Sequence, residues 1–203
     1  RRHSGTDVSA RCACQRHCFR HLHGVTAAPQ VRESVSIVTT CPGSNCLSKT
    51  ALFVDVQNIY YTTRDAYGRQ FDYRKLWAEL GEHSEITSAV AYAIARNDDH
   101  QRKFQSALRH IGFEVKLKPY IARKDGSSKG DWDVGITIDV LEIAPHVDTV
   151  VLLSGDGDFD MLMRKVSTAH GIRTEVYGVR ELTARSLIDS VDAFHPIDEH
   201  LLV

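Results

Sequence analysis

The sequence predicts an α/β domain built on a parallel sheet with helices on both faces. Short apolar runs with the length and branching of buried strands alternate with segments whose apolar residues repeat at helical spacing. The joints between these segments are short, and Asp or Gly marks most of the helix ends. Such alternation is typical of parallel strands joined by right-handed helical crossovers.

The strands are predicted from apolar runs and from alternation. They lie at residues 51–54, 86–95, 113–121, 147–153 and 172–177, which makes a sheet of about five strands. The segment 113–121 alternates apolar and polar residues, so one of its faces is expected to be less buried than the other.

The helices are predicted from the residues that begin and end them. Asp72 caps a helix that stops at Gly81, and Asp98 caps one that stops at Gly112. The remaining helices are expected at residues 131–144 before Pro145, from Phe159 to Gly171, and around residues 184–191. Residues 122–130 are rich in Gly, Ser and charge and are predicted to be a mobile loop.

Residues 1–48 differ in composition from the rest of the chain. They contain six Arg, no Lys, two acidic residues and all five cysteines, without apolar periodicity. We expect a disordered leader, or residues outside the domain, followed by one domain at 49–203. A targeting segment is an alternative, although no cleavage signal supports it. The cluster Cys12, Cys14, His17, Cys18, His21 and His23 lacks the paired spacing of structural zinc sites.

The composition of the chain excludes a membrane protein built on helices. Hydrophobic residues make up 42% of the sequence, but no apolar run approaches the ~20 residues that a spanning helix needs. The region from Lys49 onward has no cysteine, which suits the cytoplasm.

Carboxylates follow two of the predicted strands. Asp55 ends the first strand, and Asp156 and Asp158 follow the fourth on a glycine-rich turn that begins with Ser154. Ligands of open α/β sheets bind at the carboxyl ends of the strands. A helix cap needs only one carboxylate, so two in this turn favour a functional site.

Two further aspartates lie on the predicted helix at 131–144. Asp133 opens this helix, where its alternative role is to interact with the positive helix N-terminus. Asp139 lies about 120° further around the helix, so both face one cleft only if the helix end sits against it. Converging carboxylates repel one another unless cations neutralise them, and an all-oxygen ligand set suits Mg²⁺ or Mn²⁺. Such an ion supports phosphodiester hydrolysis.

Three motifs resemble, in order and spacing, the NYN domain family, the LabA-like branch of the PIN-like ribonucleases. They are Phe-Val-Asp-Val-Gln-Asn at 53–58, Lys-Gly-Asp-Trp-Asp-Val at 129–134, and Leu-Ser-Gly-Asp-Gly-Asp-Phe at 153–159. Val-Tyr-Gly at 176–178, followed by Leu-Thr at 182–183, is also similar to that branch. The resemblance covers about residues 50–198 and none of the leader.

The resemblance implies a sheet of strand order 3-2-1-4-5 and divalent-metal-dependent cleavage of RNA. The implied metal ligands are Asp55, Asp133, Asp156 and Asp158, with Asp139 as a helper. Asn58 matches an asparagine of the family that would orient a water or a phosphate, and Ser154 would support the turn.

Basic side chains near the carboxyl edge are candidates for binding the substrate. Arg96, Arg123, Lys124 and Lys129 could hold phosphates of a single RNA strand, with Ser154 beside them, although ordinary solvated loop charges are an equal alternative. Tyr60 and Tyr61 could stack on bases. The domain is net acidic, so a broad positive surface for nucleic acid is absent.

Two other functions compete with the ribonuclease. A non-catalytic RNA-binding or regulatory protein could use the same fold, although clustered carboxylates repel phosphate and give a pure binder no advantage. A phosphatase of the haloacid-dehalogenase type also has an aspartate after its first strand. That chemistry requires a second acid two residues later, and position 57 is Gln.

Overall fold

The computed structural model describes residues 47–95, 98–119, 121–122, 128–129 and 131–203. The predictions for residues 1–46, including the Cys and His cluster, lie outside the described residues, as do those for Arg96, Arg123 and Lys124. Within the described ranges, no helix combines the length and the apolar character that crossing a membrane requires.

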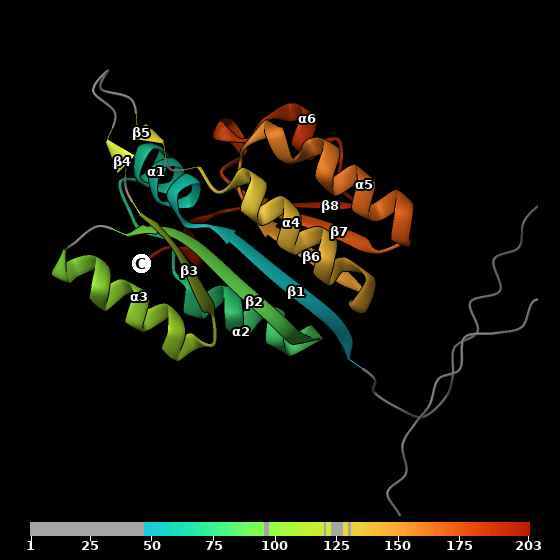
Figure 1. Cartoon of the computed structure of the whole chain (residues 1–203), viewed down its shortest axis with the longest axis horizontal. Coiled ribbons are helices and arrows are strands. Elements are labelled where there is room, and N and C mark those ends of the chain that lie inside the picture. Colours follow the sequence, from blue (N-terminus) through green and yellow to red (C-terminus); the bar gives the residue numbers. More distant parts are fainter. Residues whose placement is uncertain (1–46, 96–97, 120, 123–127, 130) are drawn as a thin grey trace, which may run out of the picture. The chain divides into compact units, whose positions relative to one another are not determined.

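The domain is built on a sheet of six strands in the order β3-β2-β1-β6-β7-β8 (Figure 1). The strands are β1 (Ser48–Asp55), β2 (Ser84–Ala95), β3 (Glu114–Pro119), β6 (Thr149–Leu153), β7 (Arg173–Gly178) and β8 (Ala193–Pro196). Every neighbouring pair is parallel. The predicted α/β class and the 3-2-1-4-5 order of the first five strands are confirmed.

The predicted number of strands was wrong, because β8 adds a sixth. β8 has only four residues, all half-buried, and it ends at Pro196. It pairs with β7 alone, at the edge of the sheet. A short edge strand without an apolar run has none of the features that identified the other five.

Helices cover both faces of the sheet. Residues of α1 (Val56–Tyr67), α2 (Tyr73–His83) and α3 (Asp99–Ile111) pack into one apolar cluster, and those of α4 (Asp133–Ile143), α5 (Asp160–His170) and α6 (Arg185–Ile188) into another. Figure 1 shows α2 and α3 on one side of the sheet and α4, α5 and α6 on the other. Strand β1 contributes to both clusters, with Leu52 in the first and Phe53 in the second.

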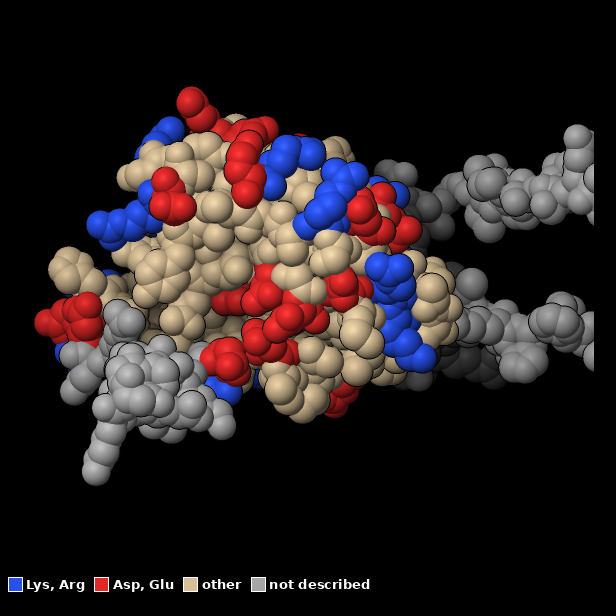
Figure 2. Space-filling model, turned by 90° about the horizontal axis from the view of Figure 1, so that it is seen from above, with Lys and Arg blue, Asp and Glu red and all other residues tan. Residues whose placement is uncertain are grey.

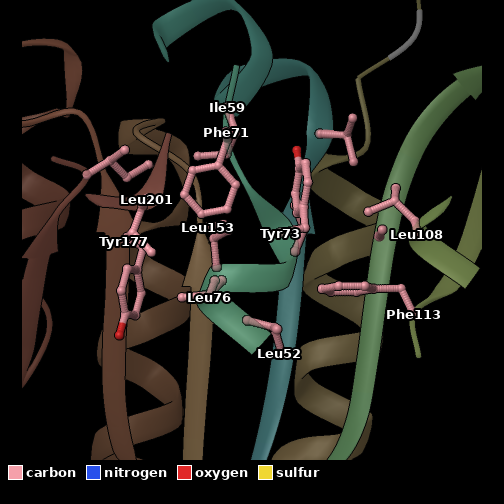
Figure 3. Close-up of a cluster of buried hydrophobic side chains, with 14 of the residues drawn as sticks. Leu52, Ile59, Phe71, Tyr73, Leu76, Leu108, Phe113, Leu153, Tyr177 and Leu201 are labelled. Atoms are coloured by element: carbon pink, nitrogen blue, oxygen red, sulfur yellow. The ribbon is translucent and has the colours of Figure 1, made fainter. Parts of the chain in front are cut away.

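The first cluster fixes α2 on the sheet. Leu76 of α2 lies beside Leu52 of β1 and Leu153 of β6 in Figure 3, and all three side chains are fully buried. Each such side chain contributes about 1.5–3 kcal/mol by leaving water.

Several predicted helix ends are confirmed. Asp72 caps α2 by accepting hydrogen bonds from the backbone N–H groups of Arg74 and Lys75, and Asp98 caps α3. Gly171 ends α5 in the left-handed conformation. The predicted stop at Gly81 was wrong, because α2 continues to His83.

Other elements differ from the prediction in extent. Helix α1 was not predicted, since it follows β1 without a loop and Asp55 is its N-cap. The final helix is a single turn, α6. A two-stranded antiparallel ribbon of β4 (Ile121–Ala122) and β5 (Ser128–Lys129) lies at the end of the predicted third strand and in the predicted loop. Four 3-10 turns complete the described elements: η1 (Ala144–His146), η2 (Gly157–Phe159), η3 (Arg180–Leu182) and η4 (Glu199–Leu201).

Gly112 should tolerate no side chain. Its φ is +128°, and an added Cβ would lie 2.6 Å from Cη2 of Trp77. We expect Gly112→Ala to lower the free energy of unfolding by about 2 kcal/mol or more, because backbone strain adds to overpacking. Urea denaturation measures this loss.

Gly81→Ala is the matched control for Gly112→Ala. Gly81 lies inside α2, and an added Cβ there would meet nothing within 4 Å. The alanine should raise the free energy of unfolding by roughly 0.5–1 kcal/mol. Equal effects of the two substitutions would contradict the packing described here.

Candidate metal centre

Three aspartates converge at the carboxyl edge of the sheet. Asp133 lies in the first turn of α4, Asp156 follows β6, and Asp158 lies in the 3-10 turn η2. Each offers a carboxylate oxygen, and these oxygens all lie within 4.8 Å of one another. Asp133 and Asp156 are half-buried and Asp158 is exposed. We call these three residues the aspartate trio.

The turn after β6 holds Asp156 in place. Its carboxylate accepts a hydrogen bond of 3.1 Å from the backbone N–H of Asp158 and thereby caps η2. Its own N–H donates to Oγ of Ser154 over 3.2 Å. Ser154 is fully buried, so its hydroxyl supports the turn and is out of reach of a substrate.

Asn58 joins this turn to the end of β1. Its side-chain Oδ1 accepts a hydrogen bond of 2.8 Å from the backbone N–H of Gly155. Its own N–H donates to Oδ1 of Asp55 over 3.1 Å. Asn58 was predicted to orient a water or a phosphate. In the structure its side-chain oxygen accepts a hydrogen bond from the protein backbone. A third segment closes the turn, since Gly155 O accepts from the N–H of Ala184.

Gly155 is required by this close packing. A Cβ at this position would lie 2.8 Å from the carbonyl oxygen of Leu182, which is backbone and cannot rotate away. The glycine of the motif thus lets the segment after β7 approach the turn that bears Asp156.

The environment of Asp55 favours its neutral form. Burial raises the pKa of this carboxyl to about 6, and the charges of Asp133 and Asp156 add to the effect. Hydrogen bonds from the N–H groups of Asn58 and Gln57 act in the opposite direction. Asp55 is therefore close enough to interact with the aspartate trio without belonging to it.

Asp133 has a similar electrostatic environment. Its pKa is raised first by burial and then by the charges of Asp131, Asp156 and Asp158, while Lys118 lowers it. Acidic side chains also form a band across the side of the molecule seen in Figure 2. Bringing these carboxylates together costs free energy that a bound cation would offset.

The donor set of the aspartate trio fits a hard divalent cation. Three carboxylate oxygens from three positions at one edge are the kind of ligands that Mg²⁺ and Mn²⁺ prefer. Burial raises the pKa of Asp133, and the charges of Asp131, Asp156 and Asp158 raise it further, so a bound cation would stabilise the charged form of this carboxylate.

Asp139, predicted as a helper, does not join the trio. Its carboxylate accepts hydrogen bonds from the hydroxyl of Tyr92 at 2.5 Å and from Nζ of Lys116 at 2.6 Å. These contacts join α4 to β2 and β3, on a different side of the helix from Asp133. Asp139 therefore helps to place α4 on the sheet.

Sequence reasoning missed Lys118 and the role of Trp132. Nζ of Lys118 donates to the carbonyl oxygen of Asp131 over 2.6 Å and lies 5.3 Å from the centre of the Trp132 ring. Nε1 of Trp132 donates to the carbonyl oxygen of Ala93 over 3.0 Å, which fixes the start of α4 against β2. Lys116 and Lys118 alternate with apolar residues in the third strand. This pattern could have predicted a basic side chain near the start of α4.

The predicted phosphate-binding group is described only at Lys129. This residue lies in β5, where the structure describes the backbone, and Arg96, Arg123 and Lys124 are outside the described residues. Their role in binding a substrate stays a prediction.

In comparisons with known proteins, residues 49–198 match the family model of the NYN domain. The protein LabA ("low amplitude and bright") of Synechococcus elongatus is 27% identical over 160 residues, which cover 75% of this chain and 85% of LabA. A crystal structure of a protein of unknown function from Vibrio parahaemolyticus is 53% identical, with a TM-score of 0.75. The match covers 79% of this chain and 99% of that one.

Loss of the Asn58 side chain should destabilise the turn after β6. In Asn58→Ala the N–H of Gly155 loses its acceptor, which should lower the free energy of unfolding by about 1–3 kcal/mol. The Gly155 amide should also exchange with solvent faster in hydrogen-exchange NMR. Asp65→Asn, on the exposed side of α1, is the control and should change stability by less than about 0.5 kcal/mol.

Stability in the presence of a chelator should depend on Asp55. Between the ordinary pKa of 3.8 and about 6, the folded protein keeps a proton on Asp55 that the unfolded chain releases. The free energy of unfolding should therefore fall as pH rises through this window, by up to about 3 kcal/mol. Denaturation from pH 4 to 7 should show a shallower fall in Asp55→Asn, and parallel curves would contradict the raised pKa.

Proposed function

Because the chain belongs to the NYN domain family, we propose that it is a ribonuclease that hydrolyses RNA phosphodiesters with a divalent cation. This PIN-like family is one of metal-dependent nucleases, and its members bind RNA. The single observation that supports the proposal for this chain is the aspartate trio at the carboxyl edge of the sheet.

Asp133, Asp156 and Asp158 would hold the cation, which we propose to be Mg²⁺ or Mn²⁺. Such an ion acidifies a water and offsets charge at the phosphoryl group. The fold holds these carboxylates in place before the ion binds, since Asp156 is fixed by the turn after β6 and Asp133 by the start of α4.

Asp55 would accept the proton of the attacking water at its carboxylate. Burial keeps its pKa near 6, close to neutral pH, where a general base is most effective. Asn58 would act as a positioning residue, because it holds both Asp55 and the turn that bears Asp156.

Single-stranded RNA is the substrate that we propose. We propose that Arg96, Arg123, Lys124 and Lys129, which the sequence predicts near the carboxyl edge, would hold its phosphates. A flexible strand can bring one phosphate to the trio without a broad basic surface. We also expect the protein to act in the cytoplasm, because residues 49–203 contain no cysteine.

Cleavage of RNA should depend on both the cation and the trio. Purified protein with Mg²⁺ or Mn²⁺ should cleave a fluorescently labelled single-stranded RNA, and excess chelator should stop the reaction. Asp133→Asn and Asp156→Asn should each lower kcat on the order of 100-fold or more, because each loses a charged ligand.

Asp160→Asn is the matched control for these variants. Asp160 lies in the first turn of α5, two residues after Asp158, and is not part of the trio. Its cleavage rate should match that of the wild type. If folded wild-type protein binds RNA tightly in chelator and never cleaves it with either metal, the non-catalytic RNA-binding alternative replaces the nuclease.

A further inference from the structure

A cavity of about 470 Å³ lies between α1 and α3, beside the end of β1 that bears Asp55. Its lining includes Gln57, Tyr60, Phe71, Tyr73, Phe104 and Gln105. The volume is within the range of small-molecule sites in proteins.

Two nearly buried polar side chains in this lining have no hydrogen-bond partner among the described residues. Tyr73 is 6% exposed and Gln105 is 7% exposed. Among the described residues, neither the Tyr73 hydroxyl nor the Gln105 amide makes a hydrogen bond. In the described part of the chain, every side-chain nitrogen or oxygen that is shielded from solvent has a hydrogen-bond partner. The unpaired polar atoms of Tyr73 and Gln105 are therefore accessible, and they reach the cavity. A ligand with matching polar groups would therefore replace water as the hydrogen-bond partner of Tyr73 and Gln105.

The lining favours an uncharged heterocycle over a phosphate. Among the described lining residues there is no Lys or Arg, and the one carboxylate, Asp98, caps α3 by accepting from the N–H of His100. The aromatic rings offer faces on which a base can stack. Glutamine amides both donate and accept, and a pair of such bonds matches the edge of adenine.

The cavity adjoins the candidate metal centre. Val56 and Gln57 of its wall directly follow Asp55 in the chain. The charge of Asp55 is also one of the causes that raise the pKa of Tyr73, so the two side chains are close. In Figure 3 the Tyr73 hydroxyl points away from Leu52 and Leu76.

We infer that this cavity is a base-binding site, which takes a nucleobase, adenine in preference, of the RNA strand that reaches the aspartate trio. The inference deepens the proposed function and rests on it, because it names the part of the substrate that lies next to the reacting phosphate. Gln105 and Tyr73 bind the edge of the base, and the aromatic rings of the wall stack on its face.

Binding of adenosine monophosphate to the full chain in chelator tests this site. Ribose 5-phosphate is the comparison probe, since it has the sugar and the phosphate but no base. By NMR titration, adenosine monophosphate should bind at least tenfold more tightly than ribose 5-phosphate and should shift resonances of α1 and α3. Equal affinity for the two probes, or shifts elsewhere, would overturn the inference.

Gln105→Leu should weaken the binding of adenosine monophosphate at least tenfold. Ser106→Ala, at the next position on the exposed side of the same helix, is the matched control and should leave the affinity unchanged. Gln105→Glu keeps the shape of the side chain and removes its donor, so it tests the same pairing if the leucine variant fails to fold. Unchanged affinity in a folded Gln105 variant would refute the role of the amide.

These measurements separate the site from the proposed catalysis, because they need neither metal nor cleavage. If adenosine monophosphate binds in a manner that depends on Gln105 but the protein never cleaves RNA, the base-binding site is supported and the proposed nuclease is refuted. If the protein cleaves RNA but binds adenosine monophosphate and ribose 5-phosphate with equal affinity, the proposed nuclease is kept and the base-binding site is refuted.

Discussion

The hydrogen bond from the backbone N–H of Gly155 to Oδ1 of Asn58 joins the two halves of the site. Asn58 lies in the first turn of α1, directly after β1, and Gly155 lies in the turn after β6. Those two strands are neighbours in the sheet, where Thr50 pairs with Thr149, although the two residues are 99 positions apart in the chain. The chain continues from the two strands into helices on opposite faces of the sheet. One amide oxygen thus sets the distance between Asp55 and the turn that bears Asp156.

The same edge of the sheet concentrates negative charge at a cost to stability. Burial and the neighbouring carboxylates raise the pKa of both Asp55 and Asp133. The fold offsets this cost with contacts that do not neutralise the trio, such as the bond from Trp132 to Ala93 and the pairing of Asp139 with Lys116. Unfavourable electrostatics maintained by surrounding structure are typical of sites that bind a charged ligand.

The sequence predicted those parts of the fold and the site that depend on local patterns. Buried strands and Asp caps are local signals, so five of the strands and the cap at Asp72 could be predicted from them. The order of those five strands is not a local property, and it was implied by the resemblance to the NYN domain family. Strand β8 and the bond of Asn58 to Gly155 depend on contacts between distant segments, which periodicity does not contain. Asp139 shows the same limit, because only the placement of Lys116 and Tyr92 reveals which side of α4 it faces.

Diffraction from crystals soaked in Mn²⁺ tests the central claim most directly, since the anomalous signal of manganese locates the ion without reference to activity. We predict a single strong anomalous peak within coordination distance of carboxylate oxygens of Asp133, Asp156 and Asp158. A peak elsewhere on the domain, or no peak at saturating Mn²⁺ with the three side chains ordered, would contradict the account.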